Sequence, residues 1–507
     1  MATDVEPFVP MSDLERRFER VRVRVGLTLA PLIFVAVLCW PIDALTENPK
    51  AQRLAAVLTT VVTLWITEAL PMPVTALLGA AACTILRVSD AKTIFAPFAD
   101  QLMFLFVGSF ILARAIFLHE LNRRVAFGVM SLNWVGGRPG RIMFAFGAVT
   151  AFISAWISNT ATTAMMMAIG LSMIHFLFDP AHAKSLGVDR RYATGLMLIT
   201  SFAASIGGLA TPIGTPPNVI GLGLIKKFLD VEISFFEWML VGVPVVVILY
   251  LFLFAYMNWF CPSGVRELAG SREMLQQNRA SLGPWTTGQK STLIAFLTTV
   301  ALWIAPGVVA LVAGEESTSY RFLRESLPEG VAALIGASLL FLLPGKTGRR
   351  AITWDEAVQI DWGVVLLYGG GFSLGELSRL TGLADAVGQG LASRLPLSGE
   401  FSLLLASTAV AALVSETTSN TASANIVVPL VISLARAAGV DPLAPALGAT
   451  FGASLGFMLP VSTPCNAIVY GTGYIPLTRM IRYGLLLDVV GVAVIVGMLH
   501  WLVPIIR

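Results

Sequence analysis

Apolar residues along this chain gather into long runs that short polar stretches separate. An α-helix needs about 20 predominantly apolar residues to cross the hydrocarbon core of a bilayer, and most of the runs have about that length. The pattern therefore predicts an all-α polytopic membrane protein. The runs cover residues 25–45, 54–70, 72–88, 101–118, 142–178, 192–225, 238–260, 292–313, 329–344, 362–392, 401–435, 443–475 and 483–506.

Two of the runs, 142–178 and 401–435, are too long for one span and contain polar residues in the middle. Each contains the triplet Ser-Asn-Thr, at residues 158–160 and 419–421. Irregular backbone is tolerated at membrane depth only where it is buried in protein or lines a cavity. We therefore expect two re-entrant hairpins, each made of two half-helices that turn at the triplet.

A second interruption follows each triplet within the next long run. The spans 192–225 and 443–475 both contain Thr-Pro-x-Asn, at residues 215–218 and 463–466. Five spans separate the two hairpins, so the second hairpin is expected to enter from the opposite face of the membrane. Two halves with the same interruptions and opposite orientation are typical of secondary transporters with inverted repeats, which bind substrate near the midplane.

These segments give about 11 transmembrane helices plus two re-entrant hairpins. With the N-terminus in the cytoplasm, the inner loops carry about twice as many Lys and Arg residues as the outer loops, as the positive-inside rule requires. Ala181, after the first hairpin, should then face the cytoplasm, and Gly439, after the second, the other side. The expected divisions are a cytoplasmic N-terminal segment 1–24, a first half 25–260, a cytoplasmic linker 261–291 and a second, inverted half 292–507.

Composition supports this class and excludes others. Hydrophobic residues make up 56% of the chain and charged residues only 13%, about half the usual charged share of a soluble protein. The net charge of +3 is small and the basic residues are dispersed, which excludes a nucleic-acid-binding protein. The sequence shows no nucleophile–base pair and no metal-binding cluster, so an enzyme is not indicated. A channel would need a continuous polar path instead of two opposed closed hairpins.

The polar interruptions indicate the chemistry of the site. Neither hairpin and neither unwound span contains Lys or Arg. Asn, Thr and Pro stand where half-helices would begin, and unpaired N–H groups at helix N-termini attract anions. Carbonyl and hydroxyl oxygens at the preceding helix ends suit a small cation such as sodium. Because a dianion is costly to desolvate against dipoles alone, bound sodium ions are expected beside it.

Polar residues in membrane helices can also have purely structural roles. Ser and Thr in membrane helices often only bond a backbone carbonyl or a neighbouring helix. The repetition of a triplet and a Thr-Pro-x-Asn break disfavours that interpretation. Ionisable residues within membrane segments are functional candidates by default, although a scaffold ion pair is the expected role for most of them. They are Glu68, Arg114, Glu376, Arg379 and Glu416, of which Glu416 lies next to the second triplet.

The paired triplets with "GTPPN" and "STPCN" resemble the divalent-anion:sodium symporter family, the INDY-type carriers of dicarboxylates, citrate and sulfate. The resemblance extends over essentially the whole chain after the first twenty or so residues. It implies a homodimer in which a scaffold domain holds a transport domain that moves as an elevator. It implies substrate contacts from Ser158, Asn159, Thr160, Thr215, Pro216, Ser419, Asn420, Thr421, Thr463 and Pro464. It implies one sodium site at Ser154, Asn159 and Gly214 and another at Ser415, Asn420 and Ser462.

The sequence therefore predicts a sodium-coupled symporter of C4-dicarboxylates such as succinate, malate and fumarate. Its partners would be the dicarboxylate, sodium ions, the lipid bilayer of the plasma membrane (the inner membrane of a bacterium) and a second copy of the chain. No cofactor is expected beyond sodium as the coupling ion. A sodium-independent dicarboxylate exchanger and a symporter for citrate or sulfate remain the alternatives.

Overall fold

The computed structural model describes residues 13–40, 45, 48–178, 187–268, 270–346, 348–394 and 399–506, so Ala181 lies outside the described residues. The elements of this part of the chain are helices, with one isolated β-bridge between Pro344 and Arg350. The first half contains α1 (Asp13–Cys39), α2 (Pro49–Thr67), α3 (Met72–Ile85), α4 (Ala91–Phe95), the 3₁₀ helix η2 (Ala96–Ala99), α5 (Gln101–Leu118), α6 (Leu121–Met130), α7 (Pro139–Ser154), α8 (Asn159–Phe178), α10 (Arg190–Gly207), α11 (Pro216–Leu229) and α12 (Phe235–Phe260).

The remaining helices follow in the second half of the chain. They are α13 (Ser271–Ser281), α14 (Thr287–Ala313), α15 (Thr318–Ser326), α16 (Glu329–Leu342), α17 (Trp354–Ala357), α18 (Trp362–Leu380), α19 (Leu383–Ala392), α20 (Glu400–Thr417), α21 (Asn420–Ala437), α22 (Leu443–Gly452), α23 (Pro464–Tyr470) and α24 (Leu477–Ile506). Seven helices of the described chain are long and apolar enough to cross a membrane, or eight if the bent pair α15 and α16 forms one span. The prediction of an all-helical polytopic membrane protein is confirmed.

Both long runs with a triplet form two helices. Residues 142–178 form α7 and α8, which pack on each other, and residues 401–435 form α20 and α21, which do the same. The second helix of each pair begins at the Asn of the triplet, Asn159 or Asn420. The predicted interruption is therefore present at both triplets.

Both Thr-Pro-x-Asn spans are also broken. Residues 208–215 separate α10 from α11, and residues 453–463 separate α22 from α23. The helices after the breaks begin at Pro216 and Pro464. Proline suits the first helical position because its missing N–H would have no partner there.

The structure differs from the sequence expectation in one apolar run and in the predicted linker. The run 362–392 is not one helix, because Gly382 adopts a left-handed conformation (φ 72°) that ends α18 and begins α19. The expected linker 261–291 contains α13 and the start of α14. The short helix α13 is polar, so a search for apolar runs does not detect it.

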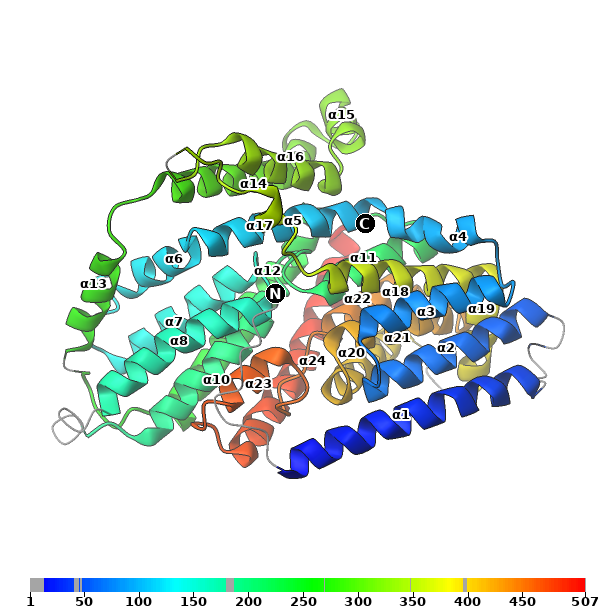
Figure 1. Cartoon of the computed structure of the whole chain (residues 1–507), viewed down its shortest axis with the longest axis horizontal. Coiled ribbons are helices and arrows are strands. Elements are labelled where there is room, and N and C mark those ends of the chain that lie inside the picture. Colours follow the sequence, from blue (N-terminus) through cyan, green and yellow to red (C-terminus); the bar gives the residue numbers. More distant parts are fainter. Residues whose placement is uncertain are drawn as a thin grey trace.

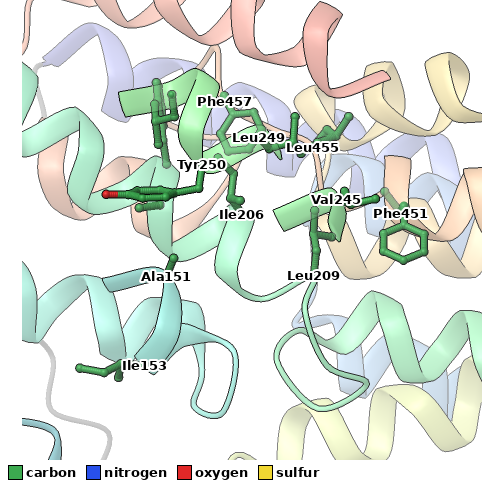
Figure 2. Packing of buried hydrophobic residues seen from close by; sticks show 14 of the residues in the cluster. Ala151, Ile153, Ile206, Leu209, Val245, Leu249, Tyr250, Phe451, Leu455 and Phe457 are labelled. Carbon is green, nitrogen blue, oxygen red and sulfur yellow. The ribbon is translucent and has the colours of Figure 1, made fainter. Parts of the chain in front are cut away.

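Helix α10 lies at the centre of the packing. Every residue of α10 from Tyr192 to Gly207 is buried, and α10 contacts α7, α8, α12 and α23. Figure 1 shows α14 and α16 along one edge of the molecule and α1 along the opposite edge. In Figure 2, α12 contributes Leu249 to a cluster that joins Ile206 of α10 to Phe457 of the second break. The broken segments of both halves therefore share one apolar core.

Helices from the two halves cross-pack around the triplets. Helix α23 packs on α8, and α11 packs on both α21 and α22. Glycine permits the approach, since a Cβ at Gly221 of α11 would lie 2.1 Å from Oγ1 of Thr450 in α22. Close packing also explains the glycine run of α18, because a Cβ at Gly371 would lie 2.0 Å from Oδ1 of Asn425 in α21. Each triplet helix thus contacts the helix that follows the other half's break.

Candidate binding site

Around the first triplet, four polar groups converge. One terminal atom of the Asn159 side-chain amide lies 2.7 Å from Oγ of Ser154, 3.1 Å from the carbonyl of Ala204 and 3.2 Å from the carbonyl of Gly214. With the amide nitrogen at that position, Asn159 donates hydrogen bonds to these oxygens. With the amide oxygen there, four oxygen atoms face one another, which is the arrangement that a small hard cation compensates. The three residues predicted for one sodium site therefore lie together.

The second triplet has a matching arrangement. The Ser415 hydroxyl donates to Oδ1 of Asn420 at 2.8 Å and lies 2.7 Å from the carbonyl of Ala453. A Cβ at Gly456 would lie 3.3 Å from Oδ1 of Asn420, 3.4 Å from Oγ of Ser415 and 3.5 Å from Cβ of Ser462. The three residues predicted for the second sodium site thus surround one glycine, whose missing side chain leaves room between them.

The substrate-contact candidates lie at helix starts. Thr215 and Thr463 are buried and precede the first residues of α11 and α23. Thr463 Oγ1 accepts a hydrogen bond from the backbone N–H of Asn466 at 3.1 Å, as an N-cap does. Pro216 is half-buried and Pro464 is exposed. Both breaks therefore end in the N-terminus of a helix, as the sequence predicts.

The triplets differ in their surroundings. Ser158 is exposed, whereas Thr160 lies beside the Cys465 thiol of the other half. Ser419 caps α21 by accepting from the N–H of Ala422 at 3.2 Å, and its hydroxyl also contacts the sulfur of Met72 in α3 at 3.2 Å. Thr421 is half-buried, like Asn159 and Asn420. Within the described ranges, no hydrogen bond joins one triplet directly to the other.

Most of the ionisable candidates form scaffold interactions, as expected. Glu68 pairs with Arg22 at 2.6 Å, and Glu376 pairs with Arg379 at 2.9 Å and with Lys227 at 3.7 Å. Arg114 differs in that it hydrogen-bonds Gln359, a neutral partner. Among the described residues, the hydrogen bonds and ion pairs of these groups do not reach either triplet.

Glu416 has a different role, next to the second site. Its carboxylate accepts the backbone N–H of Met458 at 2.7 Å and of Leu459 at 3.3 Å, together with the Ser462 hydroxyl. Glu416 is 2% exposed, and its hydrogen-bond partners in the described part of the chain include no basic side chain. Ala155 stands at the corresponding place before the first triplet. The second triplet therefore has a buried carboxyl group in the hairpin beside it that the first triplet lacks.

Sequence reasoning overlooked several residues of this region. Asp488 of α24 is buried, and its carboxyl lies beside that of Glu416 and the backbone of Phe457. A single carboxyl in the apolar run 483–506 was the signal that could have identified it. Ala204 and Ala453 contribute backbone carbonyls, which no side chain reveals.

The site is a pair of oxygen clusters next to uncharged helix N-termini, within a bundle that spans a membrane. Oxygen clusters at interrupted helices, within a bundle of helices long enough to cross a membrane, are typical of membrane transporters. A family model described as the sodium:sulfate symporter transmembrane region matches residues 23–506. The chain belongs to this family, which confirms the resemblance to the divalent-anion:sodium symporters and the expectation that the protein is a transporter and not an enzyme.

Named relatives are similar over nearly their whole length. The sodium-dependent dicarboxylate transporter SdcS of Staphylococcus saprophyticus is 33% identical over 97% of this chain and 93% of that protein. SdcS of Staphylococcus aureus strain USA300 is 32% identical over 95% of this chain and 91% of that protein.

Two solved structures share the fold at 13% sequence identity. The YdaH transporter of Alcanivorax borkumensis has a TM-score of 0.52, and the match covers 95% of this chain and 97% of that chain. MtrF of Neisseria gonorrhoeae has a TM-score of 0.55 with 96% and 97% covered. Both likenesses concern the fold alone.

Proposed function

We propose that the protein is a sodium-coupled symporter of C4-dicarboxylates such as succinate, malate and fumarate. The observation that carries this proposal is the oxygen cluster repeated at both triplets, Ser154 with Asn159 and Ser415 with Asn420. Each cluster lies at the start of a helix, and neither hairpin contributes Lys or Arg. The names of the relatives, which include both sodium and dicarboxylate, support the same function.

Coupling follows from the electrostatics of this arrangement. The N-terminus of a helix carries about half an elementary positive charge, which is too little to hold a dianion at membrane depth. Sodium ions in the two oxygen clusters would supply the missing charge. The substrate carboxylates would meet the triplet side chains and the N–H groups at the starts of α8, α11, α21 and α23. Sodium and the dicarboxylate would each bind weakly alone and would bind more tightly when both are present.

We further propose that the two halves are inverted repeats and that the protein is a homodimer in the plasma membrane with a cytoplasmic N-terminus. The helices that bear the triplets and breaks would form the transport domain. That domain would move as an elevator against a scaffold that includes α1–α5, α14, α16 and α18. Cross-packing of α8 with α23 and of α11 with α21 supports movement of both sites as one unit.

Uptake of labelled succinate into proteoliposomes tests the function. An inward sodium gradient should drive accumulation, and replacement of sodium by choline should reduce uptake to the level of empty liposomes. Exchange of internal unlabelled for external labelled succinate would establish a carrier instead of a channel. Full exchange in choline would overturn sodium coupling in favour of a dicarboxylate exchanger.

Sulfate is the second candidate substrate, because the family model is described as a sodium:sulfate symporter. Competition of succinate uptake by sulfate, citrate and glutamate ranks the alternatives. Strong inhibition by sulfate with weak inhibition by other dicarboxylates would replace the dicarboxylate assignment. Inhibition by malate and fumarate, with little effect of sulfate, supports it.

Opposite orientation of the halves has its own test. Single cysteines at Ala181 and Gly439, in a variant without Cys39, Cys83, Cys261 and Cys465, should react with an impermeant maleimide from opposite faces. Labelling of both from one side would contradict inverted repeats without affecting the proposed substrate.

A further inference from the structure

Trp156 lies in the four-residue turn between α7 and α8, two residues before the first triplet. The turn joins Ser154, the last residue of α7, to Asn159, the first residue of α8. The oxygen atoms of the first cluster therefore keep their spacing only if this turn keeps its shape. Two residues of the turn contact segments outside the hairpin. The carbonyl of Ala155 accepts the Thr211 hydroxyl, and the ring of Trp156 packs on other aromatic rings.

The Trp156 ring occupies an aromatic slot formed by α12 and α14. It lies nearly parallel to the ring of Phe235, with centroids 6.3 Å apart and an angle of 18°, and edge-on to Phe296 at 5.3 Å and 89°. Phe235 in turn stacks on Trp303 of α14 at 4.6 Å and 10°. Both stacked and edge-on geometries are favourable for aromatic pairs. The turn of the first hairpin is therefore attached to α14 through a continuous series of rings.

The slot itself is fixed by α16. Oε1 of Glu329, the first residue of α16, accepts the backbone N–H of Phe235 at 3.3 Å. The backbone carbonyl of Glu329 accepts the indole N–H of Trp303 at 3.0 Å. Gly307 permits α12 to approach α14, since a Cβ there would lie 2.4 Å from the Phe236 ring. Phe235 and Trp303 are thus held in place by contacts that do not involve Trp156.

The second hairpin lacks this device. Thr417 stands two residues before the second triplet, is exposed, and directs its hydroxyl to carbonyls of its own helix. The second turn is held instead by the Glu416 carboxylate, which bonds N–H groups of the break in its own half. The first turn has no carboxylate, so the aromatic slot is the side-chain contact that replaces it.

We propose that Trp156 is a positioning residue for the first sodium site. Seated in the slot of Phe235, Phe296 and Trp303, it holds Ser154 and Asn159 at their binding separation before the ion arrives. A preorganised site does not spend binding free energy on ordering the turn. The inference deepens the proposed function and rests on it. Because the slot includes α14 and α16, movement of the transport helices past α14 would also withdraw Trp156 and loosen the first site.

The test compares Trp156→Ala, Trp156→Phe and Thr417→Ala in proteoliposomes and in detergent. Trp156→Ala should raise the sodium concentration for half-maximal uptake about three- to tenfold, the range expected for loss of aromatic pairs, with a smaller change in maximal rate. Trp156→Phe keeps a ring in the slot and should recover most of the sodium response. Thr417→Ala, at the matching place in the other hairpin, should behave as the wild type.

Three outcomes separate the proposals. An unchanged sodium response in Trp156→Ala, or equal loss in the Phe and Ala variants, would overturn the positioning role while leaving succinate transport intact. If the wild type transports no succinate, the readout is the increase in its melting temperature when sodium is added. A smaller increase in Trp156→Ala would support the positioning role without any substrate. If Trp156→Ala does not fold, Phe296→Leu, which removes one wall of the slot, must show the same rise.

Discussion

Asn218 and Asn466 make the same pair of hydrogen bonds in the two halves of the chain. Asn218 donates its side-chain N–H groups to the carbonyls of Gly208 at 2.9 Å and Thr211 at 2.8 Å. Asn466 donates to the carbonyls of Gly456 at 3.0 Å and Leu459 at 2.9 Å. In both cases the partners lie ten and seven residues earlier, so one amide closes each unwound segment onto the helix that follows it.

This closure places a glycine against each triplet. A Cβ at Gly208 would lie 2.5 Å from Oδ1 of Asn159, and one at Gly456 would lie 3.3 Å from Oδ1 of Asn420. In each half, the Asn of the Thr-Pro-x-Asn break holds the backbone of this glycine in place. The glycine has no side chain, which leaves room for the Asn of the triplet. The same construction at both sites is the local evidence for two related halves.

Loss of either closing amide should destabilise the protein. Asn218→Ala and Asn466→Ala each leave two carbonyls without their side-chain donor, and each unsatisfied buried group costs about 1–3 kcal/mol. Asn466 also accepts the Ser201 hydroxyl at 2.6 Å, whereas no donor in the described part of the chain bonds Oδ1 of Asn218. Thermal unfolding in detergent should therefore show the larger loss for Asn466→Ala. An equal loss of thermal stability in the two variants, or a larger loss in Asn218→Ala, would contradict this difference in hydrogen bonding.

The amide of each triplet should be essential for transport. Asn159→Ala and Asn420→Ala remove the group that meets Ser154 or Ser415, so we expect uptake to fall to background while the protein remains folded. Where residual uptake is measurable, the half-saturating sodium concentration should rise. Size-exclusion chromatography establishes the fold of the variants. Transport at the wild-type rate in either one would remove the site assignment.

Glu416 should distinguish the second site from the first. Glu416→Gln keeps the size of the side chain and removes the charge beside the cluster of Ser415 and Asn420. Hydrogen bonds to charged groups contribute about 1.5–3 kcal/mol, so we expect the half-saturating sodium concentration to rise about tenfold or more. Glu68→Gln is the matched control, because Glu68 pairs with Arg22 instead. A rise of similar size in the control would attribute the effect to general destabilisation.

The sequence predicts some parts of this site well for a physical reason. Polar residues and proline within apolar runs have few ways to be accommodated, so helix starts at or near Asn159, Asn420, Pro216 and Pro464 could be predicted, and the structure has them there. The carbonyl of Ala204 could not, because every residue carries that atom and only the fold directs it.

Tertiary packing was the other limit on prediction. The place of Trp156 depends on rings from α12 and α14, which lie more than seventy residues away in sequence, and an aromatic residue in an apolar run carries no signal of its partners. The pairing of α8 with α23 likewise results from the way the halves interlock. Periodicity describes one helix at a time and does not contain this information.

Removal of sodium tests the charge balance of the whole site. Neither hairpin and neither unwound span supplies Lys or Arg, and half-helix dipoles are screened wherever water reaches them. With one sodium ion at each of the two clusters, the two charges of a dianion are balanced, and the Glu416 carboxylate adds a negative charge that favours the ion at the second cluster. Uptake should therefore rise cooperatively with sodium concentration. A third ion would make transport electrogenic, so an inside-negative potential set with potassium and valinomycin should accelerate uptake. A hyperbolic sodium dependence, with a Hill coefficient near one, would contradict two coupled ions and leave one of the two clusters without a role in transport.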